Sequence, residues 1–246
     1  MAAAMARGWA ASGGGPGAML FCDLDRGRAE ALAADVGGEV RDDLRSLRGD
    51  SDALVLAVKP AALNDVAAEL ERTAPAVISI LAATPVARLA AAFPDTPVLR
   101  VMPNQPVSVR RGVLCYVRPD DRFPADLERR LVAMLAALGS VVAVDESDID
   151  AAMAVMSCSP AYVALFAEAL ADAGVAEGLE PRLASELVAG ALAGTAELLR
   201  SDDPAAIRRA VAPPGGATEA GLDALAAAGF SGALESAVQA SLERFR

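Results

Sequence analysis

The sequence predicts a two-part α/β protein, with a doubly wound parallel sheet in residues 1–146 and an all-α domain in residues 147–246. Two observations support this prediction. In the first part, short apolar runs alternate with helical patterns, which is typical of a parallel sheet covered by helices on both faces. After Glu146 only helical patterns follow. This change places the expected domain boundary near residues 145–148.

The composition narrows the possible functions. With a net charge of −11 and no run of Lys or Arg, neither nucleic acid nor an anionic membrane is an expected partner. The chain has no histidine, which excludes a Ser-His-Asp triad, a histidine general base and a histidine-ligated metal. Its three cysteines lack metal-ligand spacing, so we expect no metal and a reducing, cytoplasmic location. No segment reaches the ~18 apolar residues expected of a membrane span.

Short apolar runs in the first domain are the expected strands. They consist mainly of Val, Ile, Leu and Ala, as in strands that are buried on both faces. Helical spacing separates several of them, and a helix over Ala2–Trp9 opens the chain. This alternation predicts a Rossmann-like nucleotide-binding sheet. The expected strands are Ala18–Cys22, Ala53–Val58, Ala76–Leu81, Val98–Met102, Val113–Val117 and Ser140–Val144, and the expected helices include Arg28–Asp35, Leu63–Leu70 and Ala125–Leu138.

The carboxyl ends of these strands hold the first candidate site residues, because ligands of such sheets bind in the crevice outside those ends. Asp23 follows the first expected strand, where an acid either binds a ribose diol or simply faces solvent. The nearby Arg26 would suit a 2′-phosphate. Lys59 followed by Pro60 places a cation and a rigid turn after another strand. Asn104 presents an amide from a stiff loop between two prolines.

The helix that begins at Ser159-Pro160 is the most apolar element of the second domain. Ser159 can cap free N–H groups, and Pro160 needs no N–H at the first helical position. Only Glu168 and Asp172 are polar before Gly174, where we expect the helix to end. A helix that is apolar on nearly all sides must be buried on all sides. Either a partner subunit or the core of one domain therefore covers it.

Helical patterns continue to the end of the chain. They comprise a helix from Pro181 with a single apolar face, a short helix capped by Asp203-Pro204, a helix over Glu219–Ala228, and a last helix that is capped by Ser231 and runs through Phe245.

The loop Pro213–Thr218 is a candidate carboxylate site. Its prolines stop the preceding helix, while Gly215 and Gly216 leave backbone N–H groups free at the start of the next one, an arrangement that suits an anion. Thr218 adds a hydroxyl that can donate or accept one hydrogen bond beside that anion. The alternative is a plain turn between helices in which Thr218 is the N-cap.

Taken together, these segments resemble the pyrroline-5-carboxylate reductase family. The resemblance extends from the first residue to the last, and no single motif decides it. The matching features are Ala57-Val58-Lys59-Pro60, Arg100-Val101-Met102-Pro103-Asn104, Glu146 ahead of Asp150-Ala151, Ser159-Pro160-Ala161-Tyr162, Gly194, and Pro214-Gly215-Gly216-Ala217-Thr218 with Gly221-Leu222.

The resemblance implies a Rossmann domain followed by a helical dimerisation domain, in a homodimer or a higher homo-oligomer built from dimers, with each active site shared across the dimer. It implies hydride transfer from NADPH, or alternatively NADH, to the C=N carbon of 1-pyrroline-5-carboxylate, which gives L-proline. A protonated cyclic imine accepts hydride without a strong general acid, so the absence of histidine fits this reaction. NAD(P)H and a small imino acid are thus the expected cofactor and substrate.

The resemblance also implies roles for individual residues. Glu146 is expected near the substrate, and Thr218 is expected to be the catalytic residue that binds the ring nitrogen. The remaining expected substrate-binding residues are Gly215, Gly216 and Ala217, and the expected cofactor-binding residues are Asp23, Ala57, Val58, Lys59, Pro60, Ile80, Leu81, Ala82 and Asn104.

The chain departs from the family pattern near the expected substrate site. Met156-Ser157-Cys158-Ser159 stands where the family has Ser-Gly-Ser-Gly, Pro213 where it has Ser, and Gln105 where Thr is usual. These departures leave two alternatives open. One is a relative that acts on a different imine or on a 3-hydroxy acid, and the other is a truncated, inactive paralogue that only dimerises.

The helix Ala2–Trp9 resembles the family's first helix, just after its Gly-rich turn. The glycines within residues 12–17 follow that helix and do not replace the turn. Because the N–H groups of such a turn bind the pyrophosphate, we expect the chain as printed to bind nicotinamide cofactors poorly. We also expect the codons upstream of Met1 to encode the first strand and the turn.

Overall fold

The computed structural model describes residues 1–246 except residues 48, 50, 71–75, 121–122 and 246. By their internal contacts the residues form two units, residues 1–158 with 244–246 and residues 159–243. The expected domain boundary between residues 146 and 147 stays a prediction. The helix that follows it, α6 (Ile149–Met156), packs into the first unit through Ile149 and Met153.

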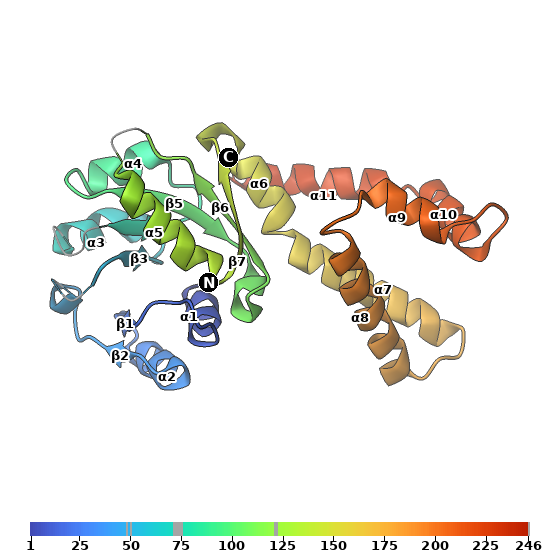
Figure 1. The fold of residues 1–246 in the computed structure, drawn as a ribbon, viewed down its shortest axis with the longest axis horizontal. Helices are drawn as coiled ribbons and strands as arrows, with labels where there is room; N and C mark the ends of the chain where they lie inside the picture. The colour runs from blue at the N-terminus through green and yellow to red at the C-terminus, as the bar shows by residue number, and fades with distance from the viewer. Residues whose placement is uncertain (48, 50, 71–75, 121–122, 246) are drawn as a thin grey trace. The chain divides into compact units, whose positions relative to one another are not determined.

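The strands of the first unit form two sheets (Figure 1). Within a sheet of five strands, β3 and β4 are parallel, as are β4 and β5. The residue pairs Leu56–Ser79 and Ser79–Arg100 are in register, so the carboxyl ends of these three strands meet at one edge. The small sheet pairs β1 (Leu20–Phe21) with β2 (Glu39–Val40), and the large one has the order β3 (Leu54–Leu56), β4 (Val77–Ser79), β5 (Val98–Pro103), β6 (Gly112–Val117) and β7 (Gly139–Val144).

The predicted parallel sheet contains one antiparallel pair, β5 with β6. Parallel neighbours need a long crossover, whereas β5 and β6 are joined only by the short 3-10 helix η3 (Gln105–Val109) and its flanking residues. Arg110 closes this link in the left-handed region, with φ 58°. The other strand pairs within the described residues are parallel, so the predicted α/β class is confirmed.

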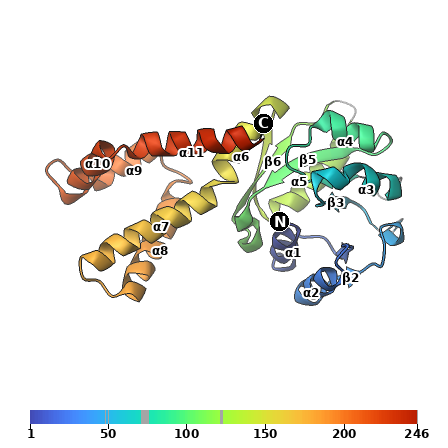
Figure 2. The same ribbon diagram turned by 180° about the vertical axis from the view of Figure 1, so that it is seen from behind.

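Helices cover both faces of the large sheet (Figures 1 and 2). Adjacent residues of β4 point to opposite sides, so Ile78 joins a core with α1 and α5, while Val77 joins a core with α3 and α4. This confirms the doubly wound arrangement. The helices of this unit are α1 (Ala2–Ala10), α2 (Arg26–Val36), α3 (Leu63–Glu69), α4 (Val86–Ala92), α5 (Ala125–Ala136) and α6, and the remaining 3-10 helices are η1 (Arg45–Leu47), η2 (Pro60–Ala62) and η4 (Glu146–Asp148).

The second unit consists of helices, as predicted, but three expected helix ends are wrong. Ser159 is the first residue of its helix instead of a cap ahead of it, and Gly174 lies inside that helix. Ser231 lies inside the last helix, which follows Gly229 at φ 78°. Asp203 caps its helix as expected, through bonds from the amides of residues 205 and 206. The helices are α7 (Ser159–Ala176), α8 (Pro181–Leu198), α9 (Pro204–Val211), α10 (Ala217–Ala227) and α11 (Phe230–Phe245).

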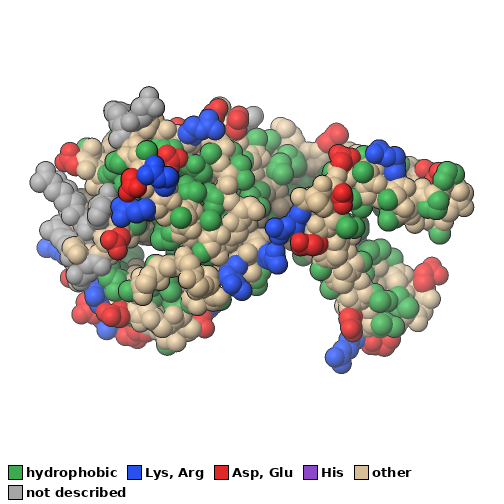
Figure 3. Space-filling view, in the orientation of Figure 1, with side chains coloured by type: hydrophobic (Ala, Val, Ile, Leu, Met, Phe, Trp, Pro, Cys, Tyr) green, Lys and Arg blue, Asp and Glu red, His purple; other side chains and the backbone are tan. Residues whose placement is uncertain are grey.

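Apolar side chains of α7 and α8 lie at the surface of the chain (Figure 3). All residues of α7 are described, and none is buried. Leu165 is 64% exposed and Leu187 is 54% exposed. A single chain therefore leaves this apolar surface in contact with water, and each large aliphatic side chain forgoes part of the ~1.5–3 kcal/mol that full burial contributes.

One sequence expectation about membranes is wrong as stated. The helical stretch Glu146–Ala176 has the length and composition of a membrane span, with a mean hydropathy of 1.5 over its best window. Alanines between the larger apolar residues produce this value without an unbroken run of large side chains. A single helix of this kind is weak evidence of a span, because a core helix of a soluble protein passes the same test.

Gly139 is the backbone position at which the sheet tolerates least change. It has φ 146°, and a Cβ there would lie 2.0 Å from the carbonyl oxygen of Gly112 on β6. Gly139→Ala should therefore destabilise the first unit by about 1–3 kcal/mol, through strain and overpacking. The measurement is the midpoint of urea unfolding. Gly17→Ala is the control, because no atom lies within 4 Å of the added Cβ there, and equal midpoints for the two variants would contradict this reading of the contact.

Candidate functional site

Two of the expected cofactor segments lie side by side at the carboxyl edge of the sheet. The first follows β3, where Ala57, Val58 and Lys59 are exposed and Pro60 begins η2. The second follows β4, where Ile80 is half-buried and Ala82 is exposed. The register of β3 with β4 places these segments next to each other. Leu81 is 1% exposed, so only its backbone is available to a ligand.

The turn after β4 has a defined conformation. Ala83 adopts φ 49°, which is unusual for a residue with a Cβ. The hydroxyl of Thr84 is 2.9 Å from the carbonyl oxygen of Ala82, to which it donates, and Thr84 is fully buried. Ser79 is also fully buried at the end of β4, and its hydroxyl accepts a bond from the amide of Leu81. The turn is thus held from within by polar side chains.

Glu146 connects two elements at the same edge. One of its carboxylate oxygens, Oε1, accepts a bond of 2.6 Å from the amide of Val86, the first residue of α4. The same oxygen accepts a bond of 3.0 Å from Nη1 of Arg100 on β5. The side chain of Arg100 is 4% exposed, against 40% for Glu146, and its Nε has no hydrogen-bond partner within the described residues.

Asn104 is 6% exposed and bonds to the backbone through both ends of its amide. Its Nδ2 donates to the carbonyl oxygen of Met156 over 2.9 Å, and its Oδ1 accepts from the amide of Val113 over 2.8 Å. Asn104 therefore ties the end of β5 to the start of β6 and the end of α6. Its expected contact with the cofactor stays a prediction, and these bonds give it a structural role in addition.

Asp23 lies in the exposed loop after β1, at the carboxyl end of the small sheet. Its Oδ1 accepts a bond from the amide of Asp25 over 2.9 Å, and Asp25 in turn caps α2. The guanidinium of Arg26 bonds to the carboxylates of Asp42 and Glu30, which raise its pKa above the ordinary value. Arg26 is therefore already paired with two acids in this structure.

The expected substrate loop lies at the start of α10. Gly215 is left-handed, with φ 75°, and Gly216 is the N-cap of the helix. Thr218 lies exposed in the first turn, so the alternative in which Thr218 is itself the N-cap is wrong. The amide of Gly215 donates to Oε2 of Glu219 over 2.7 Å. A carboxylate thus already contacts one of the N–H groups expected to bind an anion.

The sequence alone assigned no role to Ser79, Thr84, Arg100 or Glu219. A polar residue within an apolar strand run, as at Ser79, is a usable signal, and so is Thr84 ahead of Pro85 at a helix start. The pairing of Arg100 with Glu146 joins residues 46 positions apart. Sequence spacing contains no signal for that pair.

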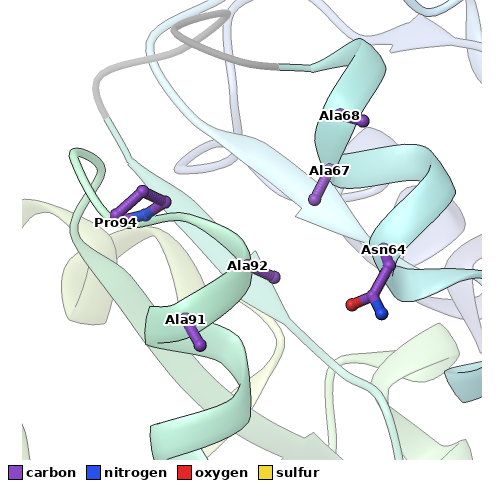
Figure 4. A pocket seen from close by; sticks show the side chains of 6 residues that line it. All are labelled: Asn64, Ala67, Ala68, Ala91, Ala92 and Pro94. Atoms are coloured by element: carbon purple, nitrogen blue, oxygen red, sulfur yellow. The ribbon is translucent and has the colours of Figure 1, made fainter.

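A hollow between α3 and α4 is a further candidate site (Figure 4). Among the residues that line the hollow, only Asn64 has a polar side chain. The other lining residues are Ala67, Ala68, Ala91, Ala92 and Pro94. Without converging polar groups the hollow is a poor candidate for a catalytic site. Across the described part of the chain, no group of three or more Cys, Asp or Glu residues is arranged to hold a metal ion.

Two family models match the chain. A model described as pyrroline-5-carboxylate reductase dimerisation matches residues 146–246. A model described as NADP oxidoreductase, coenzyme F420-dependent, matches residues 1–83.

Proteins that are named pyrroline-5-carboxylate reductase match most of the chain. The protein from Synechocystis is 41% identical over 79% of this chain and 74% of its own length. The protein from Pseudomonas aeruginosa is 33% identical over 99% of this chain and 92% of its own length.

Solved structures agree with these matches. The 1-pyrroline-5-carboxylate reductase from Streptococcus pyogenes has a TM-score of 0.87 at 28% identity and covers 100% of this chain and 94% of its own. The pyrroline carboxylate reductase from Plasmodium falciparum, solved with NADP bound, has a TM-score of 0.82 at 26% identity, over 98% of this chain and 92% of its own.

The resemblance inferred from the motifs is therefore confirmed by sequence identity, by the matched dimerisation region and by the fold. The α/β first unit and the helical second unit are shared with a solved member of the family. The chain belongs to the pyrroline-5-carboxylate reductase family.

Proposed function

We propose that this protein reduces the C=N bond of 1-pyrroline-5-carboxylate to give L-proline, with NADPH or NADH as the hydride donor. The observation that supports this most directly is 41% identity to a pyrroline-5-carboxylate reductase over 79% of the chain. The reaction adds one hydride to the imine carbon, and the nitrogen keeps the proton that it carries as an iminium. Two electrons leave the nicotinamide and two reduce the C=N bond.

The loop Gly215–Thr218 suits the substrate's carboxylate. The contact of Glu219 with the amide of Gly215 supports this assignment, because it places a carboxylate on the same N–H group. The positive end of the α10 dipole favours an anion at this place. The exposed hydroxyl of Thr218 then bonds to the ring nitrogen, next to the carboxylate in the substrate. Gly216 and Ala217 offer backbone N–H groups and little steric bulk.

The nicotinamide cofactor fits the carboxyl edge of the sheet. The exposed residues Ala57 and Ala82 have small side chains that allow a ligand to approach the backbone. The remaining proposed cofactor residues are Asp23, Val58, Lys59, Pro60, Ile80, Leu81 and Asn104. The bound cofactor supplies the hydride, while the protein positions the imine and excludes water.

We further propose that the protein acts as a cytoplasmic homodimer, or as a higher homo-oligomer of dimers. The exposed apolar residues of α7 and α8 and the match of residues 146–246 to the dimerisation model support a partner copy over a lipid bilayer as their cover. A net charge of −11 argues against an anionic membrane or nucleic acid as partner.

Turnover of 1-pyrroline-5-carboxylate tests the proposed function. Purified protein should form one L-proline for each NADPH or NADH oxidised, as measured by amino-acid chromatography alongside cofactor absorbance. Because Met156–Ser159 and Pro213 depart from the family pattern, other cyclic imines and 3-hydroxy acids are tested in parallel. Activity on one of those compounds alone would favour the related oxidoreductase, and inactivity on all of them would favour the non-catalytic paralogue.

The hydroxyl of Thr218 should matter for turnover. Thr218→Val keeps the shape of the side chain but removes a hydrogen bond to a charged group, which is worth about 1.5–3 kcal/mol and corresponds to roughly a 10- to 100-fold loss of kcat/KM. Thr218→Ser keeps the hydroxyl and is the control, with a smaller loss expected. Cofactor affinity should be unchanged in both variants. Equal kcat/KM for Thr218→Val and the unmodified protein would contradict the role of Thr218.

The charge of Asp23 should influence the choice of cofactor. Asp23 repels a 2′-phosphate and can bind a ribose diol, so we expect usable activity with NADH as well as NADPH. Asp23→Asn should raise the ratio of kcat/KM for NADPH to that for NADH. Asp95→Asn, an exposed acid just before the amino end of β5, is the control. A preference of the unmodified protein for NADPH above about a thousandfold, worth ~4 kcal/mol, would indicate that Asp23 does not face the ribose.

A further inference from the structure

Arg100 lies at one end of the turn that follows β4, and Glu146 lies at the other end. Arg100 is in register with Ser79, the last residue of β4, so it flanks the point where the turn begins. Glu146 bonds to the amide of Val86, where the turn ends and α4 begins. The ion pair between them, with 3.0 Å between Nη1 and Oε1, therefore connects the two ends of the turn across the sheet edge.

The turn between these ends is one that needs support. Ala83 has φ 49°, a conformation that a residue with a Cβ rarely adopts and that persists only where surrounding contacts impose it. The bond from the hydroxyl of Thr84 to the carbonyl oxygen of Ala82 closes the turn from inside. The bond from Val86 to Glu146 holds it from outside, at the helix terminus where a negative charge is favourable.

The burial of Arg100 makes the charge of Glu146 necessary. The side chain of Arg100 is only 4% exposed, so its guanidinium has lost most of its hydration, and its Nε has no hydrogen-bond partner within the described residues. A carboxylate on Nη1 offsets that cost, and removing one partner of such a pair leaves the other buried without compensation. Arg100 thus holds the Glu146 carboxylate against the start of α4.

We propose that Arg100 and Glu146 are positioning residues for the cofactor, acting through the turn Ile80–Pro85. This proposal rests on the proposed function, in which Ile80 and Ala82 face the nicotinamide cofactor. It replaces the position near the substrate that the resemblance implies for Glu146 with a role at the cofactor turn, without contact with the imino acid. Loss of the pair should weaken cofactor binding while leaving the affinity for the imino acid in place.

Glu146→Gln tests the proposal with little change of shape. The variant keeps an oxygen that can accept from Val86 but removes the charge that pairs with Arg100. We expect the Kd for NADPH, measured by calorimetry without substrate, to rise at least about fivefold, which corresponds to ~1 kcal/mol by the usual conversion. The KM for 1-pyrroline-5-carboxylate should stay within about twofold of its original value, whereas removal of a direct bond to the substrate would raise it.

Asp145→Asn is the matched control. Asp145 precedes Glu146 in sequence and also pairs with an arginine, Arg118, over 3.3 Å, but both of those side chains are more than 60% exposed. A surface ion pair of this kind contributes little to stability. This variant should therefore leave the Kd for NADPH and the KM for 1-pyrroline-5-carboxylate unchanged.

Amide hydrogen exchange gives a second readout that needs neither cofactor nor activity. In Glu146→Gln, the amides of residues 80–88 should exchange faster than in the unmodified protein, while those of β6 should not. If this variant does not fold, Glu146→Asp replaces it, since that residue keeps the charge but withdraws the oxygen from Val86. The same weakening of NADPH binding is expected.

Two results would overturn the proposal. One is a raised KM for 1-pyrroline-5-carboxylate with an unchanged Kd for NADPH, which would place Glu146 at the substrate. The other is unchanged NADPH binding and unchanged exchange in residues 80–88. Because NADPH binding and exchange are measured without the imino acid, an absence of turnover would count against the proposed function alone.

Discussion

The register of β3, β4 and β5 is the constraint on which the proposed cofactor site depends. It brings the ends of three parallel strands to one edge, and the residues that follow each strand gather there. Hydrogen bonds then hold the segments that follow these strands in place. Thr84 and Glu146 hold the turn after β4, and Asn104 ties the end of β5 to its neighbours. Small exposed residues face solvent next to the buried polar residues Thr84, Arg100 and Asn104, which is the arrangement expected of a preorganised ligand site.

In the proposed enzyme, the loop Gly215–Thr218 of the second unit binds the carboxylate of the substrate beside a hydrogen-bonding hydroxyl. Gly215 adopts a left-handed conformation that a residue without a Cβ enters at no steric cost. The backbone N–H of Gly215 donates to the carboxylate of Glu219 in this fold. With Thr218 in the first turn of α10, the proposed site combines backbone N–H groups and a hydroxyl within a few residues. A site with so few polar groups suits a reaction in which the substrate already carries its reactive iminium and the enzyme mainly orients two reactants.

Much of the fold could be predicted from sequence, since strands buried on both faces read as apolar runs. β5 and β6 lie within a residue of their predicted positions. The helix α4 was missed because its short, Ala-rich segment has little periodicity, and the antiparallel β5–β6 pair was missed although the short link could have indicated it. Their place at the end of a strand singles out Lys59 and Pro60, whereas the family resemblance singles out Ile80–Ala82, and the cofactor roles of both segments stay predictions. The pair Arg100–Glu146 could not be predicted from the sequence, because a contact between residues 46 positions apart depends on tertiary packing. The membrane-like composition of Glu146–Ala176 likewise reflects many alanines that a simple count of large apolar residues overlooks.

In the proposed enzyme the cofactor binds at the ends of β3 and β4, while the carboxylate of the imino acid binds at the start of α10. Hydrogen exchange measured by mass spectrometry, with saturating NADPH and separately with saturating L-proline, tests both halves of this central claim in one experiment. NADPH should slow exchange in residues 54–62 and 79–88, and L-proline should slow exchange in residues 213–222. Protection by NADPH confined to α3 and α4 around the hollow lined by Asn64, or no protection of residues 213–222 by L-proline, would contradict the claim.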